Sequence, residues 1–133
     1  MKKSSLVISI AIVFLISFVV SSLAIAHGWK APKKDSKISN PLMTDNIIIQ
    51  TGKKLYSNLC SACHGKSAEG GANLNLDMKP VPPDLTKRLK GHSDGDFYWK
   101  IKTGRGDMPP FKEELEQKEI WQIITYIRSL TTK

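Results

Sequence analysis

The sequence predicts an all-α domain, and three observations lead to that prediction. Two stretches, residues 46–60 and 113–131, repeat apolar residues at steps of three and four, the period of a helix that buries one face. Residues 94–103 carry the start and stop residues of a shorter helix. No stretch convincingly alternates apolar and polar residues as a half-buried strand would. The chain of 133 residues has room for one folded domain.

The first 26 residues are typical of an export segment. Lys2 and Lys3 precede an uncharged apolar run, residues 6–26, that ends in Ala24-Ile25-Ala26. These features predict a cleaved signal peptide over residues 1–26. The run also approaches the length of about 20 residues that spans a bilayer, so an uncleaved membrane anchor is the alternative. Both alternatives place the rest of the chain in the periplasm or on the outer face of the cytoplasmic membrane.

Residues 27–45 separate this segment from the predicted domain, residues 46–133. They are rich in proline, lysine and small polar residues and follow neither the helical nor the strand period, which predicts a flexible linker. The formal charge of the chain is +8. This charge suits an acidic protein partner or an anionic membrane surface. Nucleic acid is a poor partner for an exported chain.

The first predicted helix, residues 46–60, has an unusual residue on its apolar face. That face contains Ile48, Gly52, Leu55, Tyr56 and Leu59. Thr44, Asp45 or Asn46 can cap its start. A glycine within a helix costs about 1 kcal/mol relative to alanine. A close contact with a second helix would offset that cost, because Gly52 has no side chain to hold the neighbour away.

The rest of the predicted domain consists of a long loop and two further helices. Residues 65–91 are rich in glycine, proline, asparagine and lysine, which predicts a long loop that wraps around a group other than protein. Asp94 can cap the helix at 94–103 and Gly104 can end it. Arg128 lies near the end of the last helix, residues 113–131, where a cation suits the helix dipole.

The motif CSACH at residues 60–64 contains the two cysteines of the chain, and it allows three chemistries. A thioredoxin-type disulfide would need Cys60 and Cys63 near a strand–helix unit, which this sequence lacks. A structural zinc site would need four ligands, and no second pair accompanies this one. Covalent attachment of a c-type haem fits best. Cys60 and Cys63 would form thioethers to the haem vinyl groups, and His64 would bind the iron.

Residues 46–131 resemble the small single-haem c-type cytochromes of the bacterial class I type. The resemblance rests on Gly52 and Tyr56 before CSACH, a proline-bearing loop, GRGDMPPF at 104–111, and a final helix with Trp121 and Tyr126. It implies the cytochrome c fold, in which three or four helices wrap around one covalently bound haem c. It also implies that the first and last helices cross near Gly52.

Four residues are candidates for the second axial iron ligand: Met43, Met78, Met108 and His92. Met43 lies before the haem motif, and Met78 follows it with little chain left to cross the haem. His92, which stands between a glycine and a serine, is expected to be a solvent-exposed loop residue. In the family that the chain resembles, the ligand lies in a G-x-G-x-M-P stretch, which implies Met108.

A haem-bound histidine usually donates its second ring N–H to a carbonyl or carboxylate. In similar cytochromes the acceptor is a proline carbonyl in the loop after the haem motif. The resemblance therefore makes Pro82 and Pro83 candidates for the carbonyl partner of His64.

The expected function is that of a single-haem electron-transfer protein, not an enzyme. Its iron would cycle between Fe(III) and Fe(II) and connect respiratory redox partners. Lys66, Lys79 and Lys112 would steer docking to an acidic face of a partner. The alternatives are a haem sensor or small haem catalyst with an open or labile sixth position, and an anchored cytochrome module of a larger respiratory complex.

Overall fold

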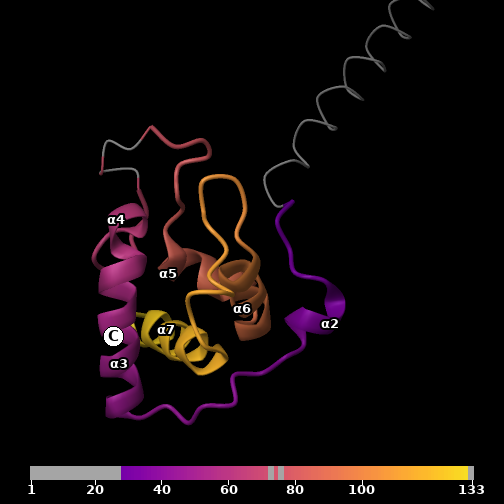
Figure 1. Cartoon of the computed structure of the whole chain (residues 1–133), viewed down its shortest axis with the longest axis vertical. Helices are drawn as coiled ribbons and strands as arrows, with labels where there is room; N and C mark the ends of the chain where they lie inside the picture. Colours follow the sequence, from indigo (N-terminus) through magenta and orange to yellow (C-terminus); the bar gives the residue numbers. More distant parts are fainter. Residues whose placement is uncertain (1–27, 72–73, 75–76, 132–133) are drawn as a thin grey trace, which may run out of the picture. The chain divides into compact units, whose positions relative to one another are not determined.

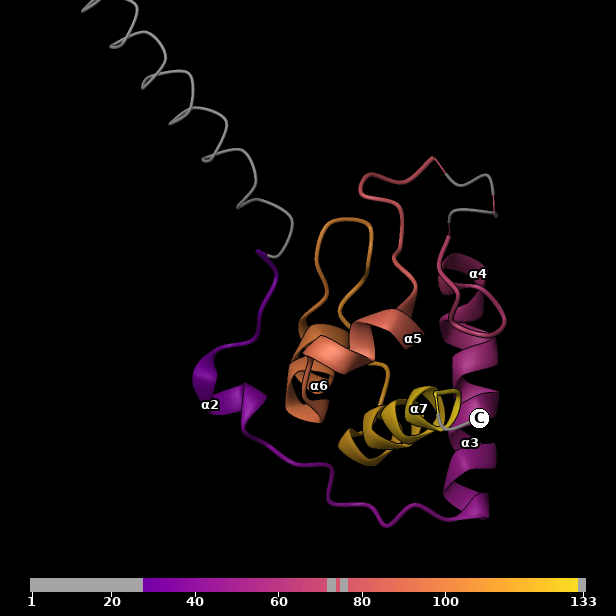
Figure 2. The same ribbon diagram turned by 180° about the vertical axis from the view of Figure 1, so that it is seen from behind.

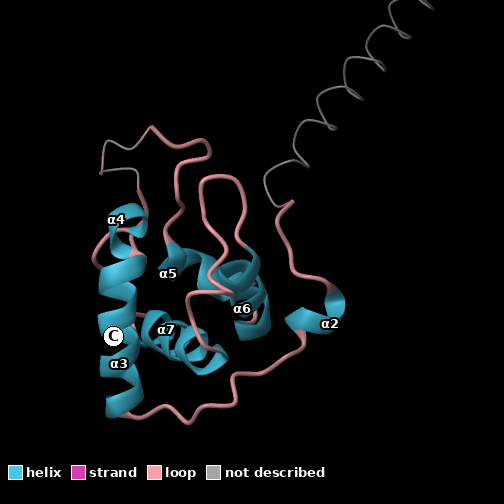
Figure 3. Cartoon of the chain, in the orientation of Figure 1, coloured by secondary structure: helices cyan, strands magenta, loops and turns pink. Residues whose placement is uncertain are grey.

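A computed structural model describes residues 28–71, 74 and 77–131, and residues 31–133 belong to one unit. The elements in chain order are α2 (Lys33–Ser36), α3 (Asn46–Leu59), α4 (Ser61–His64), α5 (Leu85–Arg88), the 3-10 helix η2 (Leu89–Gly91), α6 (Asp94–Thr103) and α7 (Gln117–Ser129). The all-α prediction is confirmed (Figure 3). The predicted signal peptide or anchor lies outside the described residues. Within the described ranges, every helix is too short or too polar to cross a membrane.

Helix α3 agrees with its prediction to within one residue. Its N-cap is Asp45, whose side chain accepts a hydrogen bond from the backbone N–H of Ile48 at 2.8 Å. Gly52 and Tyr56 are buried, and both lie on the predicted apolar face. The helix ends at Leu59, directly before the CSACH motif.

The close helix contact expected at Gly52 is present. A Cβ atom at this position would overlap the backbone carbonyl of Gln122 in α7 and would lie 3.0 Å from the Cβ of Tyr126. The two helices cross there (Figures 1 and 2). Gly52 therefore lets the backbones of α3 and α7 come close together, which any side chain would prevent. This contact offsets the loss of helix stability that a glycine causes.

Helix α6 has the predicted bounds but a different N-cap. Ser93, not Asp94, caps the helix, and its hydroxyl accepts from the backbone N–H of Asp96 at 3.2 Å. The Asp94 carboxylate instead accepts from Arg128 Nε in α7 at 2.7 Å. Asp94, which the sequence predicted as the N-cap of α6, therefore forms a tertiary ion pair with Arg128 instead.

Helix α7 begins at Gln117, four residues later than expected. Glu116 and Glu119 form a reciprocal capping box at its start. The segment before it makes a turn in which Leu115 N–H donates to the carbonyl of Phe111 at 2.9 Å. Both of these apolar side chains are buried in the core with the isoleucine stripe of α7, which explains the helix-like spacing of the turn.

The structure differs from the flexible linker predicted for residues 27–45. Residues 31–42, here called the arm, include α2 and pack along α6 and α7. The backbone N–H of Ala31 donates to Asp96 Oδ1 at 2.7 Å, and Asn40 Nδ2 donates to Thr125 Oγ1 at 2.9 Å. The arm is held by separate polar contacts with irregular spacing, so no periodic pattern in the sequence reveals it. The structural unit therefore starts at residue 31 rather than at residue 46.

Candidate functional site

The CSACH motif forms a single turn that continues from α3. Cys60 ends α3 and precedes α4, and its carbonyl accepts from the N–H groups of Cys63 at 3.2 Å and His64 at 2.9 Å. Both cysteines are free thiols and both are half-buried. The local helix therefore places two thiols and one imidazole within one turn.

The end of this turn is anchored to the core. Gly65 has a φ of +82°, a conformation that favours glycine, and it ends α4. The hydroxyl of Tyr56 donates to the Gly65 carbonyl at 2.8 Å, in a buried hydrogen bond. Tyr56 also packs against Tyr126 of α7, with ring centroids 5.3 Å apart. The orientation of the turn therefore depends on the crossing of α3 and α7.

Burial changes the protonation of the site. It lowers the pKa of His64, which favours the neutral imidazole, the form that binds a metal. Burial, with a smaller contribution from the charge of Cys63, raises the pKa of Cys60 to about 12. Cys60 is therefore a thiol and not the reactive thiolate of a disulfide oxidoreductase.

One imidazole nitrogen of His64 has no partner within the described part of the chain. Nδ1 is buried and makes no hydrogen bond there. Buried polar atoms of this kind are rare in folded proteins and require an explanation. A free pair of thiols beside a neutral, incompletely bonded histidine fits a group that is attached through sulfur and ligated through nitrogen.

The following loop returns to this turn. Gly70 N–H donates to the His64 carbonyl at 2.8 Å, and Gly71 N–H donates to the Pro82 carbonyl at 2.9 Å. Gly70 has a φ of +94°, and a Cβ atom there would lie 2.8 Å from the Pro82 oxygen. Pro82 is half-buried and Pro83 is exposed. No hydrogen bond among the described residues joins His64 to either proline, so the proposed carbonyl partner stays a prediction.

Met108 lies in a short hairpin between α6 and α7. Arg105 N–H donates to the Met108 carbonyl at 2.9 Å, and Met108 N–H donates back to the Arg105 carbonyl at 3.1 Å. Gly104, with a φ of +62°, lets the chain turn there. The Met108 side chain is half-buried against the core. Figures 1 and 2 show the hairpin of residues 104–111 at the same end of the domain as α4.

The other axial candidates occupy different places. Met43 is 83% exposed and precedes α3, whose 14 residues put about 21 Å between it and Cys60. Met78 is half-buried in the loop before Pro82. His92 is not the exposed loop residue that was expected: its side chain is 16% exposed and its Nδ1 bonds to Asp96 Oδ2. Asp96 lies four residues later, in the first turn of α6, and the chain before that helix turns His92 back onto it.

The three lysines expected to guide docking are exposed. Lys66 follows α4 directly, and Lys79 lies in the loop that leads to Pro82. Lys112 has an acidic neighbour, because its Nζ lies 3.6 Å from Glu113 Oε1. Its contribution to a positive docking surface is therefore smaller than its exposure suggests.

Sequence reasoning missed two features that support the site. It treated Tyr56 as an apolar helix residue, although its hydroxyl holds the turn after His64. It also gave no role to Gly70 and Gly71, which join the His64 turn to Pro82. The glycines of the HGKSAEGG stretch were the available signal, because positive φ at such positions favours glycine.

The helical fold and this donor set define a c-type cytochrome domain. A family profile described as "Cytochrome C oxidase, cbb3-type, subunit III" matches residues 48–127, which is more than half of the chain. The chain belongs to this family of c-type cytochromes. Membership together with the Cys60–Cys63 motif implies covalently attached haem c.

Individual relatives agree with this assignment. The chain is 26% identical to cytochrome c550 of Pseudomonas aeruginosa, over 84% of this chain and 86% of that protein. It is 24% identical to cytochrome c6 of Synechococcus elongatus, over 64% of this chain and 93% of that protein. A crystal structure of cytochrome CL from Methylophaga aminisulfidivorans superposes with a TM-score of 0.55 at 27% identity, covering 78% of this chain and 71% of that one. The chain spans less than half the length of several further relatives that it matches.

Proposed function

We propose that this protein is a single-haem electron carrier outside the cytoplasm, in the periplasm or on the outer face of the cytoplasmic membrane. The observation that carries the proposal is the CSACH turn of a cytochrome c family member, in which two free thiols precede a histidine whose Nδ1 atom is buried. Bound haem supplies a one-electron Fe(III)/Fe(II) couple. The chain contributes attachment, ligation and a surface for redox partners.

His64 and Met108 are the proposed axial ligands. Burial keeps the His64 imidazole neutral, and its turn is held by the Tyr56 hydroxyl. Met108 is supported by its half-buried side chain and by its constrained hairpin, which lies at the same end of the domain as α4 (Figure 1). A methionine opposite a histidine raises the reduction potential, as an electron acceptor in a respiratory chain requires.

Pro82 is the better of the two candidates for the carbonyl partner of His64. Its carbonyl accepts from Gly71 and lies beside Gly70, whose N–H donates to the His64 carbonyl, whereas Pro83 is exposed. A carbonyl oxygen has two lone pairs, so the bond from Gly71 leaves one for the imidazole N–H. Such a bond would orient the ring and increase its basicity as a ligand.

Redox proteins with acidic docking faces are the proposed partners. Lys66 and Lys79 are exposed near the CSACH turn and its returning loop, and they would accelerate encounter with an acidic surface. Charge variants of these lysines should reduce the salt dependence of the electron-transfer rate. An unchanged salt dependence would contradict this part of the proposal.

Absorption spectra of the haem-loaded protein test the ligand set. The reduced protein is expected to be low-spin and unchanged by carbon monoxide. Met108→Ala should open the sixth position and allow a carbon monoxide complex. Met43→Ala is the matched control, because Met43 is exposed before α3, and it should leave the spectrum unaltered.

One outcome would contradict the electron-carrier proposal, and a second would contradict the assignment of Met108 as ligand. A carbon monoxide complex in the unsubstituted protein would favour a haem sensor or small catalyst with a labile sixth position. A Met108→Ala variant with an unchanged low-spin spectrum would mean that another residue, such as Met78, is the ligand. The double variant Cys60→Ala/Cys63→Ala should lose covalent haem, whichever residue is the sixth ligand.

A further inference from the structure

A second surface of the domain carries a cluster of positive charge away from the CSACH turn. Lys33, Lys34 and Lys37 of the arm are exposed, and Lys102 of α6 is exposed beside them. Asp35 is the one acidic residue in the sequence from 28 to 44. The arm is therefore strongly basic, because Asp35 can neutralise only one of its three lysines.

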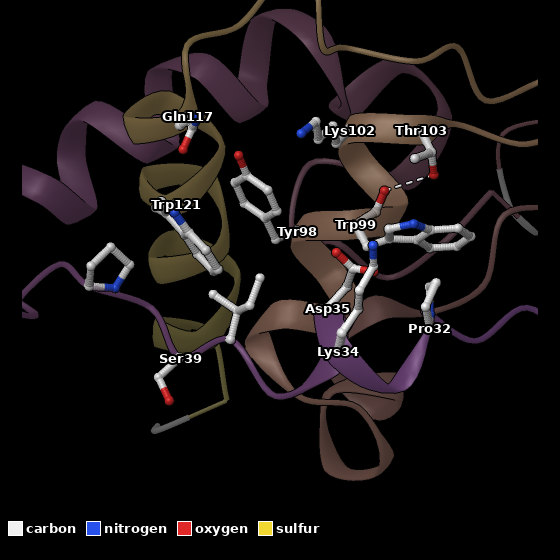
Figure 4. A pocket seen from close by; sticks show the side chains of 12 residues that line it. Pro32, Lys34, Asp35, Ser39, Tyr98, Trp99, Lys102, Thr103, Gln117 and Trp121 are labelled. Atoms are coloured by element: carbon white, nitrogen blue, oxygen red, sulfur yellow. Dashed lines mark hydrogen bonds between the residues drawn. The ribbon is translucent and has the colours of Figure 1, made fainter.

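Aromatic and apolar side chains lie among these lysines. The arm, α6 and α7 line an open cavity of about 630 Å³ (Figure 4). Tyr98 stacks on Trp121 there, with ring centroids 4.3 Å apart. Trp99 is half-exposed, and Ile38 is 44% exposed. Lysine beside tryptophan, tyrosine and aliphatic side chains is the composition found where proteins meet the membrane–water interface.

The sequence before the arm brings this surface close to a bilayer. The apolar run ends at residue 26, five residues before Ala31. An extended chain of that length covers about 17 Å, so a membrane that holds the run would lie within that distance of Ala31. Ala31 is itself bonded to Asp96 in α6. The basic arm therefore begins within reach of such a membrane.

We propose that this face, formed by Lys33, Lys34, Lys37, Lys102 and Trp99 and here called the docking face, binds an anionic lipid surface. The lysine ammonium groups attract the lipid phosphates, and Trp99 and Ile38 enter the headgroup region. Attraction of this kind extends about 8 Å at physiological salt and increases with each lysine.

The position of the docking face has a consequence for the haem site. Contacts join α2 to α6, α6 to α7, and α7 to α3, in that order. Figures 1 and 2 place α2 and α4 on opposite sides of the domain. A domain docked through the arm would therefore keep the CSACH turn away from the lipid and accessible to a protein partner.

Spin labels can measure this orientation in the full haem-loaded protein, whether or not residues 1–26 are retained. A label at Ser39→Cys reports on the docking face, because Ser39 is exposed and lines the cavity. A label at Ser57→Cys is the matched control, exposed on α3 near the CSACH turn. Collision of each label with a water-soluble nickel complex is measured with phosphatidylcholine vesicles and with vesicles that also contain phosphatidylglycerol.

Phosphatidylglycerol should protect the Ser39 label and leave the Ser57 label accessible. The variant Lys33→Gln/Lys34→Gln/Lys37→Gln should need on the order of 100-fold more anionic lipid for the same protection, about fivefold for each lysine. The control variant Lys53→Gln/Lys54→Gln/Lys90→Gln removes three exposed lysines elsewhere and should need no more anionic lipid than the unsubstituted protein.

Three results would overturn the proposal. Equal protection by neutral and anionic vesicles would exclude attraction to lipid charge. Absence of protection by both would exclude docking of this face. Protection by soluble polyglutamate without protection by phosphatidylglycerol vesicles would assign the face to an acidic protein. Each result is independent of the haem ligands and of electron transfer.

Discussion

Helix α7 is held from two sides, and the two contacts differ in kind. On one side α3 crosses it at Gly52, where the backbones of the two helices lie close together and buried apolar side chains pack around the crossing. On the other side the arm holds it through Asn40, whose amide donates to Thr125 Oγ1 at 2.9 Å. The first contact follows a periodic apolar pattern and the second follows none. Helix contacts made by a periodic apolar face can therefore be predicted from the sequence. Single hydrogen bonds between distant residues cannot.

The α3–α7 crossing should be the more sensitive of the two contacts. Gly52→Ala would drive a methyl group into the Gln122 carbonyl, so the helices would have to separate. We expect the free energy of unfolding to fall by about 3 kcal/mol, measured by urea denaturation with circular dichroism. Gly91→Ala is the control, because a Cβ there meets nothing within 4 Å, and it should change stability by less than about 0.5 kcal/mol. Equal effects at both glycines would mean that the crossing is looser than described.

The polar contact of the arm with α6 should rank second. Asp96 is 4% exposed, and its carboxylate accepts from Ala31 N–H and from Lys100 Nζ, each at 2.7 Å. Asp96→Asn should reduce the free energy of unfolding by about 2 kcal/mol in the same assay. Asp107→Asn, at an exposed loop position, should have almost no effect. A neutral result at Asp96 would show that the arm contributes little to stability.

The effect of Asp96 should also depend on pH. Burial alone would raise the pKa of Asp96, but hydrogen bonds from Lys100 and Ala31, with the charge of Lys100, hold that pKa below its usual value. The stabilisation is present above the unfolded-state pKa of about 3.9 and is lost as pH falls through the lower folded-state pKa. The stability difference between the native protein and Asp96→Asn should therefore be smaller at pH 3 than at pH 7. A difference that grows on acidification would contradict this sign.

The link between the crossing and the haem motif can be tested at Tyr56. Tyr56→Phe removes the buried donor to the Gly65 carbonyl and should cost about 1.5 kcal/mol. The looser turn should also broaden the signals of the His64 ring in nuclear magnetic resonance spectra of the reduced protein. Tyr98→Phe is the control, because the Tyr98 hydroxyl has no hydrogen bond with a described residue and its ring stays stacked on Trp121. Identical His64 signals in both variants would remove Tyr56 from the support of the site.

The smallest effect is expected at Asn40. Asn40→Ala removes the donor to Thr125 and should lower stability by about 1 kcal/mol. Because the contact is local, faster trypsin cleavage at Lys33, Lys34 or Lys37 should be the clearer readout. Asn58→Ala, on the exposed side of α3, should leave the cleavage rate unchanged. Unaltered cleavage in Asn40→Ala would mean that other contacts are sufficient to hold the arm.

Most of the helical framework could be predicted, and the errors have local causes. The bounds of α3 and α6 agree with the apolar period and with their terminal residues. The start of α7 was placed at residue 113, but residues 111–115 form a turn that buries Phe111 and Leu115, and the helix begins at Gln117. His92 was expected in solvent because its sequence neighbours are small, but it bonds to Asp96, which lies in the first turn of α6.

The candidate site also has a part that the sequence predicted and a part that it did not. Cys60, Cys63 and His64 are adjacent in the chain, so the chemistry of the motif and the family it belongs to were evident from the residues alone. Short-range geometry of this kind depends on one helical turn. The Tyr56 hydroxyl, the bond from Gly71 to Pro82 and the docked arm instead join residues of different segments, from 9 to 85 positions apart. Such contacts depend on how whole helices pack, and single polar partners leave no repeating pattern from which a sequence could reveal them.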